Sequence, residues 1–154
     1  MAETAERTDG NASDDELSTR LAAARTIAVV GIKDRESEDA FRVPRYLQEQ
    51  GYQIVPVNPK LQRVLAERSH ASLVDVDEPV DLVNLFRAPD HVPAHVDEIL
   101  AMSPQPATVW MQLGIIHGGA AATLRAPGIA VVQDRCLMVE HRRLRVGRAR
   151  DLGT

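Results

Sequence analysis

The sequence predicts an α/β protein with a three-layer, Rossmann-like, doubly wound fold: a five-stranded, mainly parallel sheet with helices on both faces. Three observations lead to this prediction. Five short and almost wholly apolar runs recur along the chain, helix-like patterns separate them, and no repeat or second domain is visible in the 154 residues. Apolar, β-branched runs are typical of strands buried on both faces, and regular alternation of strand and helix implies parallel pairing with right-handed crossovers.

The chain opens with a polar segment before its first regular element. Residues 1–12 are rich in acids and are predicted to be a disordered lead. Ser13 or Asp14 then caps a predicted helix whose apolar positions are spaced by four and three residues. The first strand is predicted at 26–31, where the run TIAVVG ends in a glycine.

The next part of the chain continues the alternation. A helix is predicted over about residues 42–50, because a glycine stop follows an apolar stripe there. The second strand is YQIVPV at 52–57. Residues 60–67 are predicted to form a short helix, followed by a loop in which Leu73 and Val76 pack inward.

The second half contains the remaining three strands. A helix with one apolar stripe begins at Pro89, and an alanine-rich helix is predicted at about 118–126. The segment DRCLMVEH, after the last strand, is predicted to be a loop that enters a packed region. The strands are predicted at 81–86, 107–112 and 129–134.

These elements define one domain at 13–146, with a C-terminal tail at 147–154. The composition, with 44% hydrophobic and 26% charged residues, is ordinary for a globular protein. No apolar run is long enough to span a membrane, the N-terminus has no signal-peptide pattern, and a single cysteine suits a reducing compartment. We therefore expect a cytoplasmic protein without a membrane partner.

Charge and aromatic content argue against a nucleic-acid partner. The net charge of −4 comes from the first twenty residues, and the rest of the chain is neutral. Nucleic-acid binding draws on phosphate neutralisation and base stacking, yet aromatic residues make up only 3% of the chain. A symmetric homodimer is the default expectation for assembly, because most oligomers are two-fold.

In a doubly wound sheet, ligands bind beyond the carboxyl ends of the strands, where the strand order reverses. After the first strand, Gly31 allows a tight turn, but Lys33 and Glu36 stand where a dinucleotide motif has further glycines. NAD-binding domains place a carboxylate after the second strand, whereas this chain has Asn58, a proline and then Lys60. A cation there suits a phosphorylated ribose, so coenzyme A (CoA) and NADP both remain open.

Five motifs in order carry a family resemblance: IAVVGIK, VPRYLQEQGYQIVPVNPK, VDLVNLFRAPDHVP, VWMQLGI and DRCLMVEH. They span about residues 26–141, and with them the chain resembles the small, single-domain bacterial CoA-binding proteins, which are related to the CoA-binding domain of succinyl-CoA synthetase alpha subunits. The resemblance implies a Rossmann-like fold with the pyrophosphate near Gly31 and the adenosine near Asn58. The turns at Phe86 and at Gln112 would flank the pantetheine arm. Two acids, at 38 and 39, precede the first helix of the motif and would repel a pyrophosphate that they faced.

The prediction is therefore a protein that binds CoA or acyl-CoA, a small-molecule nucleotide, without catalysis of its own. The alternatives are an NAD(P)-dependent oxidoreductase on the same fold and a non-catalytic interaction module with a vestigial nucleotide site. No catalytic residue and no metal ligand is predicted: the pair His91 and His95 lacks a third ligand, and Cys136 is weighed as either a reactive or a buried thiol. The predicted cofactor-binding residues are Gly31, Ile32, Lys33, Val43, Asn58, Pro59, Lys60, Phe86, Arg87, Gln112, Gly114 and Cys136.

Overall fold

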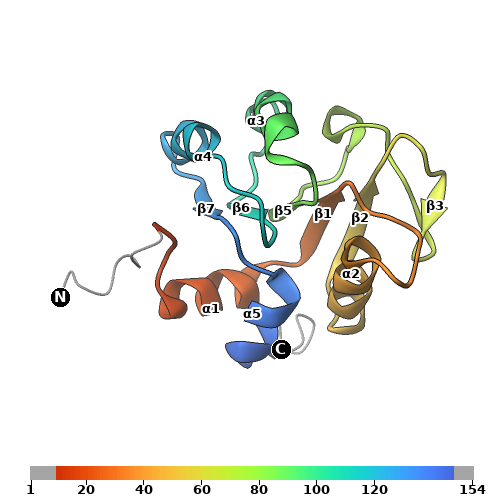
Figure 1. Cartoon of the computed structure of the whole chain (residues 1–154), viewed down its shortest axis with the longest axis horizontal. Helices are drawn as coiled ribbons and strands as arrows, with labels where there is room; N and C mark the ends of the chain where they lie inside the picture. Colours follow the sequence, from red (N-terminus) through yellow and green to blue (C-terminus); the bar gives the residue numbers. More distant parts are fainter. Residues whose placement is uncertain (1–9, 148–154) are drawn as a thin grey trace.

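A computed structural model describes residues 10–147 and contains one central sheet. Its five strands lie in the order β2-β1-β5-β6-β7, and all neighbouring pairs are parallel (Figure 1). This arrangement confirms the predicted fold class, and each strand falls within its predicted segment. The strands are β1 (Thr26–Val30), β2 (Gln53–Val57), β5 (Leu82–Leu85), β6 (Thr108–Met111) and β7 (Ala130–Val132).

Helices cover both faces of the sheet and complete the three layers (Figure 1). Helices α3 and α4 pack on one face, and α1, α2 and α5 pack on the other. Among the described residues no helix is long and apolar enough to cross a membrane. The α-helices are α1 (Asp14–Ala23), α2 (Asp39–Glu49), α3 (Val92–Leu100), α4 (Gly118–Arg125) and α5 (Leu137–Arg143), and the short 3-10 helices are η2 (Leu73–Asp75) and η3 (Pro89–His91).

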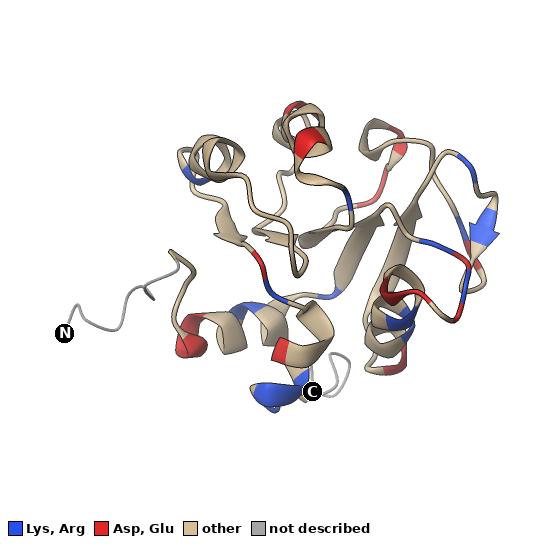
Figure 2. Cartoon of the chain, in the orientation of Figure 1, with Lys and Arg blue, Asp and Glu red and all other residues tan. Residues whose placement is uncertain are grey.

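The strands of the central sheet carry no charged residue, whereas charges lie on the helices, the loops and the short hairpin at 63–68 around it (Figure 2). This pattern follows from burial, because a strand covered on both faces leaves no solvated side for a charge. The first turn of α1 is acidic, and its Asp14 carboxylate accepts two hydrogen bonds from Arg143 in the basic last turn of α5, at 2.8 and 2.9 Å. This contact holds the last helix against the first.

The outer edge of β2 is occupied by a short extended segment. Pro56 lies within β2, and its missing N–H falls on the outer side of the strand, where a proline is tolerated. His70 forms a parallel bridge with Val57: its N–H donates to the Pro56 carbonyl at 2.9 Å, and its carbonyl accepts from the Asn58 N–H at 2.8 Å.

The opposite edge, at β7, is bound by the N-terminal segment. The Asn11 side chain is fully buried and forms two hydrogen bonds with the backbone of Gln133, one with its N–H at 2.9 Å and one with its carbonyl at 3.0 Å. Arg125 donates to the carbonyl of Val131 at 2.9 Å. Ordered structure therefore begins before residue 13, while the rest of the predicted lead (1–9) and most of the predicted tail (148–154) lie outside the described residues.

Two local predictions are wrong. The segment predicted as a helix at 60–67 is a hairpin of β3 (Arg63–Val64) and β4 (Glu67–Arg68), whose turn residues both have positive φ. No glycine marks this turn, so the sequence lacked the usual signal. The segment after β7 begins as a loop, as predicted, but continues as the helix α5, which is short enough for its apolar stripe to be missed. Leu73 is buried and Val76 partly buried, as predicted.

Candidate functional site

The strand order reverses between β1 and β5, which makes the crevice at their carboxyl ends the place where a ligand is expected. Gly31 follows β1 there with a φ of 86°, and a Cβ atom at this position would lie 2.3 Å from the carbonyl oxygen of Phe86. The Gly31 N–H donates to the Val57 carbonyl at 2.9 Å. Gly31 is thus required by the packing of three strand ends, whether or not a ligand is bound.

Two adjoining hollows form a groove along this edge of the sheet. The larger has a volume of about 680 Å³ and the smaller of about 220 Å³. They share four lining residues: Gly31, Lys33, Phe86 and Arg87. Together they have the size of a site for a small molecule or cofactor.

Most of the predicted cofactor-binding residues line this groove. Besides the four shared residues, Asn58, Pro59 and Lys60 line the smaller hollow. Gln112, Gly114 and Cys136 line the larger hollow. Ile32 and Val43 line neither hollow, because both side chains are fully buried in the core beneath α2.

Asn58 fixes the turn that follows β2. Its side-chain amide donates to the carbonyl of Ile32 at 2.7 Å, and its side-chain oxygen accepts from the N–H of Lys60 at 2.8 Å. One amide therefore joins the loop after β1 to the loop after β2, and it sets where the Lys60 side chain starts.

Gln112 holds the beginning of α5. Its side-chain oxygen accepts from the N–H of Leu137 at 2.9 Å, and the residue is almost fully buried. This contact gives the Gln112 side chain a structural role, because its oxygen already has a partner within the protein. It also places Cys136, the residue before α5, at the wall of the larger hollow, where its thiol is half-buried.

The groove carries an unusual set of cations. Lys33 and Lys60 are the two lysines of the whole chain, and both line the groove. Their side chains are exposed and have no ion pair or hydrogen bond within residues 10–147. Arg87 is half-buried, and its Nε atom is buried without a partner in the same part of the chain.

Two acids face the same groove. Glu38 and Asp39 line the larger hollow at the start of α2. Asp39 forms an ion pair with Arg42, which offsets its charge, whereas Glu38 has no ion pair within the described residues. A single unbalanced carboxylate thus remains beside the cations.

Sequence reasoning missed several residues that other elements bring to the groove. Ser72 and His95 line the smaller hollow, from the segment before η2 and from α3. Apolar side chains of the β6–α4 loop and of α5 also line the larger hollow, namely Ile115, Met138 and Val139, beside Leu113 of the turn at Gln112 that was expected there. Contacts of this kind depend on how distant segments pack, so no local sequence pattern predicts them.

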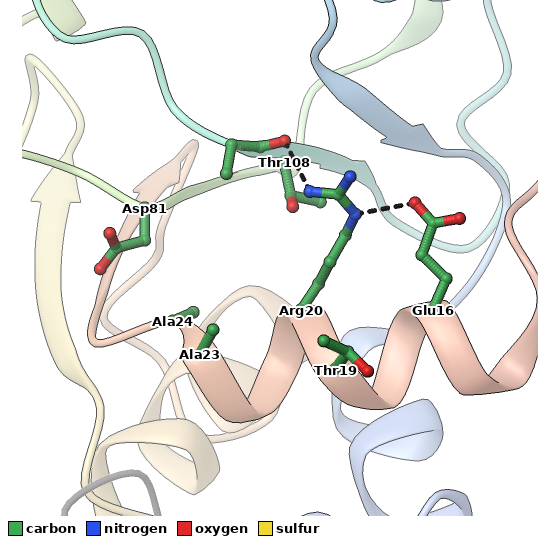
Figure 3. A pocket seen from close by; sticks show the side chains of 8 residues that line it. Glu16, Thr19, Arg20, Ala23, Ala24, Asp81 and Thr108 are labelled. Carbon is green, nitrogen blue, oxygen red and sulfur yellow. Dashed lines mark hydrogen bonds and ion pairs between the residues drawn. The ribbon is translucent and has the colours of Figure 1, made fainter. Parts of the chain in front are cut away.

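A separate hollow of about 350 Å³ lies at the amino ends of the strands, between α1 and the starts of β5 and β6 (Figure 3). Its charged groups already have partners. Arg20 donates to Glu16 at 2.9 Å and to the Ala107 carbonyl at 3.3 Å, and Asp81 accepts from the N–H groups of Arg25 and Thr26. These groups hold α1 to the strands, so we do not assign a ligand here.

Burial shifts the pKa of side chains that lie between α1, α2 and α5. Burial raises the pKa of Tyr52 to about 12, and its hydroxyl donates to the Leu21 carbonyl at 2.5 Å. Burial lowers the pKa of His141, whose Nδ1 lies 2.7 Å from the Tyr46 hydroxyl. Burial also raises the pKa of Tyr46. These side chains join α1, α2 and α5, so their shifts reflect packing.

Comparison with known proteins agrees with the fold. The protein YneT of Bacillus subtilis (strain 168), described as uncharacterized, is 34% identical over 131 residues, 85% of this chain and 96% of that protein. A solved structure from Thermus thermophilus is 47% identical with a TM-score of 0.81, and the match covers 86% of this chain and 98% of that one. A hypothetical protein from Pyrococcus horikoshii OT3 is 31% identical with a TM-score of 0.83, covering 90% and 96%.

The model of the CoA binding domain family matches residues 25–142, which include all five strands and every residue of the groove. The chain therefore belongs to the CoA-binding domain family.

Proposed function

We propose that this protein binds CoA or an acyl-CoA in the groove at the carboxyl edge of the sheet and performs no catalysis of its own. Membership of the CoA-binding domain family supports the ligand class. The smaller hollow then takes the adenosine with its 3′-phosphate, and the larger hollow takes the pantetheine arm.

The observation that carries the proposal is the free cation after β2. Lys60 follows Asn58 at the wall of the smaller hollow, and no acid occupies this turn. A carboxylate at this place would accept the hydroxyls of an unmodified ribose, whereas an ammonium group favours a phosphorylated one. CoA carries such a phosphate on its adenosine ribose.

The rest of the groove suits the remaining parts of CoA. Lys33 and Arg87 lie where the two hollows meet, which suits the charge of a pyrophosphate. The apolar side chains of Leu113, Met138 and Val139 line the larger hollow, which suits a pantetheine arm and an uncharged acyl group.

Calorimetric titration of the wild-type protein and of Lys60→Ala with CoA, dephospho-CoA and NADP tests the proposal. We expect wild type to bind CoA more tightly than NADP, and Lys60→Ala to weaken CoA about tenfold while dephospho-CoA changes little, because a charge-assisted contact to the 3′-phosphate is lost. Arg68→Ala is the control, since this exposed cation lies on β4 and lines neither hollow.

Three outcomes contradict the proposal in different ways. Equal losses for CoA and dephospho-CoA reject the phosphate contact at Lys60. Tighter binding of NADP than of CoA favours the oxidoreductase alternative. If the wild-type protein binds neither CoA nor NADP, the non-catalytic interaction module is the alternative that remains.

Amine labelling gives an independent test, because the chain has two lysines. Acetylation followed by peptide mass spectrometry should show Lys33 and Lys60 protected by CoA. Unchanged labelling of both lysines at saturating CoA argues against a ligand in the groove.

A further inference from the structure

A chain of hydrogen bonds outside the predicted site residues holds a histidine at the smaller hollow. Ser72 donates to one oxygen of the Glu98 carboxylate at 2.9 Å, and the other oxygen lies 2.8 Å from Nδ1 of His95. The side chains of His95 and Glu98 are 15% and 27% exposed. His95 and Ser72 both line the smaller hollow, together with Lys60.

The contact with Glu98 fixes the tautomer of the neutral His95 ring, that is, which of its two nitrogens carries the hydrogen. A carboxylate only accepts hydrogen bonds, so Nδ1 carries the hydrogen. The other ring nitrogen, Nε2, is neither buried nor partnered by any residue between 10 and 147. The ring is thus held in place by one nitrogen, while the second has no partner within the described residues and the residue itself lines the hollow.

The order of these three side chains does not suit nucleophilic catalysis. In a triad the histidine stands between the hydroxyl and the carboxylate, so that it can take the hydroxyl proton. Here the carboxylate stands in the middle, and Ser72 donates to Glu98 rather than to His95. Nor is a metal site formed, because the described residues contain no group of three or more His, Cys, Asp or Glu side chains that could hold an ion.

The surroundings of His95 favour an anion. Lys60, Lys33 and Arg87 line the same hollow and bring cationic groups to it. On the elements that pack against α3, the charged and titratable side chains of Asp75, Asp90, His91 and Arg125 are exposed and do not line it. Glu98 lies behind the ring and balances its charge when it is protonated.

We propose that protonated His95 donates a hydrogen bond through Nε2 to the terminal 3′-phosphate of bound CoA, so that binding takes up a proton. This inference rests on the proposed function. A neutral ring with Nδ1–H presents only a lone pair at Nε2, which repels a phosphate oxygen, whereas the protonated ring presents a donor and a positive charge. Histidine changes charge near neutral pH, so the phosphate draws the ring into its charged form.

The test is calorimetric titration in two buffers with different ionisation enthalpies at pH 7.5, which gives the number of protons taken up on binding. At this pH the phosphate itself is almost fully ionised, because its second pKa is about 6. For wild type we expect net proton uptake with CoA and none with dephospho-CoA. We also expect CoA to bind about twofold or more tightly at pH 7.0 than at pH 8.0.

Two variants separate the nitrogens of the ring. His95→Asn keeps a donor near the Nδ1 position for Glu98 but removes Nε2, and His95→Gln places a polar group that does not titrate near Nε2. Both should lose the proton uptake, and His95→Asn should weaken CoA severalfold while dephospho-CoA is unchanged. His91→Asn is the matched control on η3 and should behave as wild type, since His91 is exposed and lines neither hollow.

The outcomes separate this inference from the proposed function. If wild type binds CoA and His95→Asn takes up as many protons as wild type, the inference is overturned and the CoA site stands. If wild type takes up no proton with CoA, the inference is likewise overturned. If wild type does not bind CoA at all, the proposed function fails and the inference fails with it.

Discussion

The Cα of Gly31 faces the carbonyl of Phe86 so closely that a methyl group on Gly31 would lie 2.3 Å from the carbonyl oxygen. This approach joins the ends of β1 and β5 at the point where the strand order reverses. The two turns that border both hollows are therefore locked together by backbone packing, before any side chain meets a ligand.

Gly31→Ala should accordingly lower the free energy of unfolding by about 3 kcal/mol, from an unfavourable φ and from a clash with backbone that cannot move aside. Gly114→Ala is a matched control, because Gly114 has the same φ of 86° and open space around its Cα. The control should lose only about 1 kcal/mol. Urea unfolding of both variants measures the difference, and equal losses would contradict the clash.

Glu38→Gln should tighten CoA binding about threefold at low salt, since it removes an unbalanced carboxylate beside a ligand that carries several negative charges. Glu49→Gln, at the far end of α2, should leave affinity unchanged because Glu49 is exposed and lines neither hollow. Titration at low and high salt checks this, because the gain should shrink as salt screens the charge. Weaker binding by Glu38→Gln would show that the carboxylate helps to hold the ligand.

The stability of the fold should fall as pH drops below about 6.5, the ordinary pKa of histidine. Burial lowers the pKa of His141 in the folded protein, so the unfolded chain binds a proton in this range while the folded protein does not. Proton uptake by the unfolded state alone shifts the equilibrium towards unfolding.

Urea midpoints at pH 7.5 and 5.5 measure this effect of His141. His141→Phe should reduce the loss of stability between the two pH values, whereas His91→Gln, at an exposed position, should keep it. A His141→Phe protein with the full wild-type pH dependence would assign the effect to other groups.

Asn84→Leu should raise the free energy of unfolding by about 1 kcal/mol or more. Asn84 lies in β5 between Val29 and Trp110, fully buried, and neither polar atom of its amide has a partner among residues 10–147. An unpaired buried amide costs free energy that an apolar side chain of similar size does not.

The comparison variant for this experiment is Asn58→Leu, which removes an amide with two backbone partners and should be destabilised. Thermal and urea unfolding of both variants measure whether the free energy of unfolding rises, as expected for Asn84→Leu, or falls, as expected for Asn58→Leu. A destabilised Asn84→Leu protein would show that the amide is satisfied in solution by a group such as a buried water.

The sequence predicted those parts of the site that follow directly from strand ends. Gly31, Asn58 and Arg87 each come just after an apolar run, and parallel strands bring their carboxyl ends to one edge. Ile32 was predicted on the same reasoning, whereas Val43 begins one of the family motifs and lies within α2; the side chain of each turns into the core instead. The position of a residue along the chain predicts which edge of the sheet it lies at, but it does not predict the direction in which its side chain points.

What sequence reasoning missed depends on packing between layers. His95 was weighed only with its neighbour four residues earlier, as a metal pair, because that relationship is local. Its real partners are Glu98 on the same helix and, through it, Ser72, which reaches α3 only after the chain has folded. The hairpin at β3 and β4 was missed for a different reason, since its turn uses Leu65 and Ala66 at positive φ without a glycine.

The two lateral edges of the sheet, at β2 and β7, have a consequence for how two molecules of this protein can associate. Pro56 offers no N–H outward and His70 already occupies that rim, while the carboxamide of Asn11 takes both outward groups of Gln133. Strand addition by a second copy or by an extended peptide, the route to continuous intermolecular sheets and fibres, is therefore blocked at both rims. Any pairing of two molecules has to form through helices or loops.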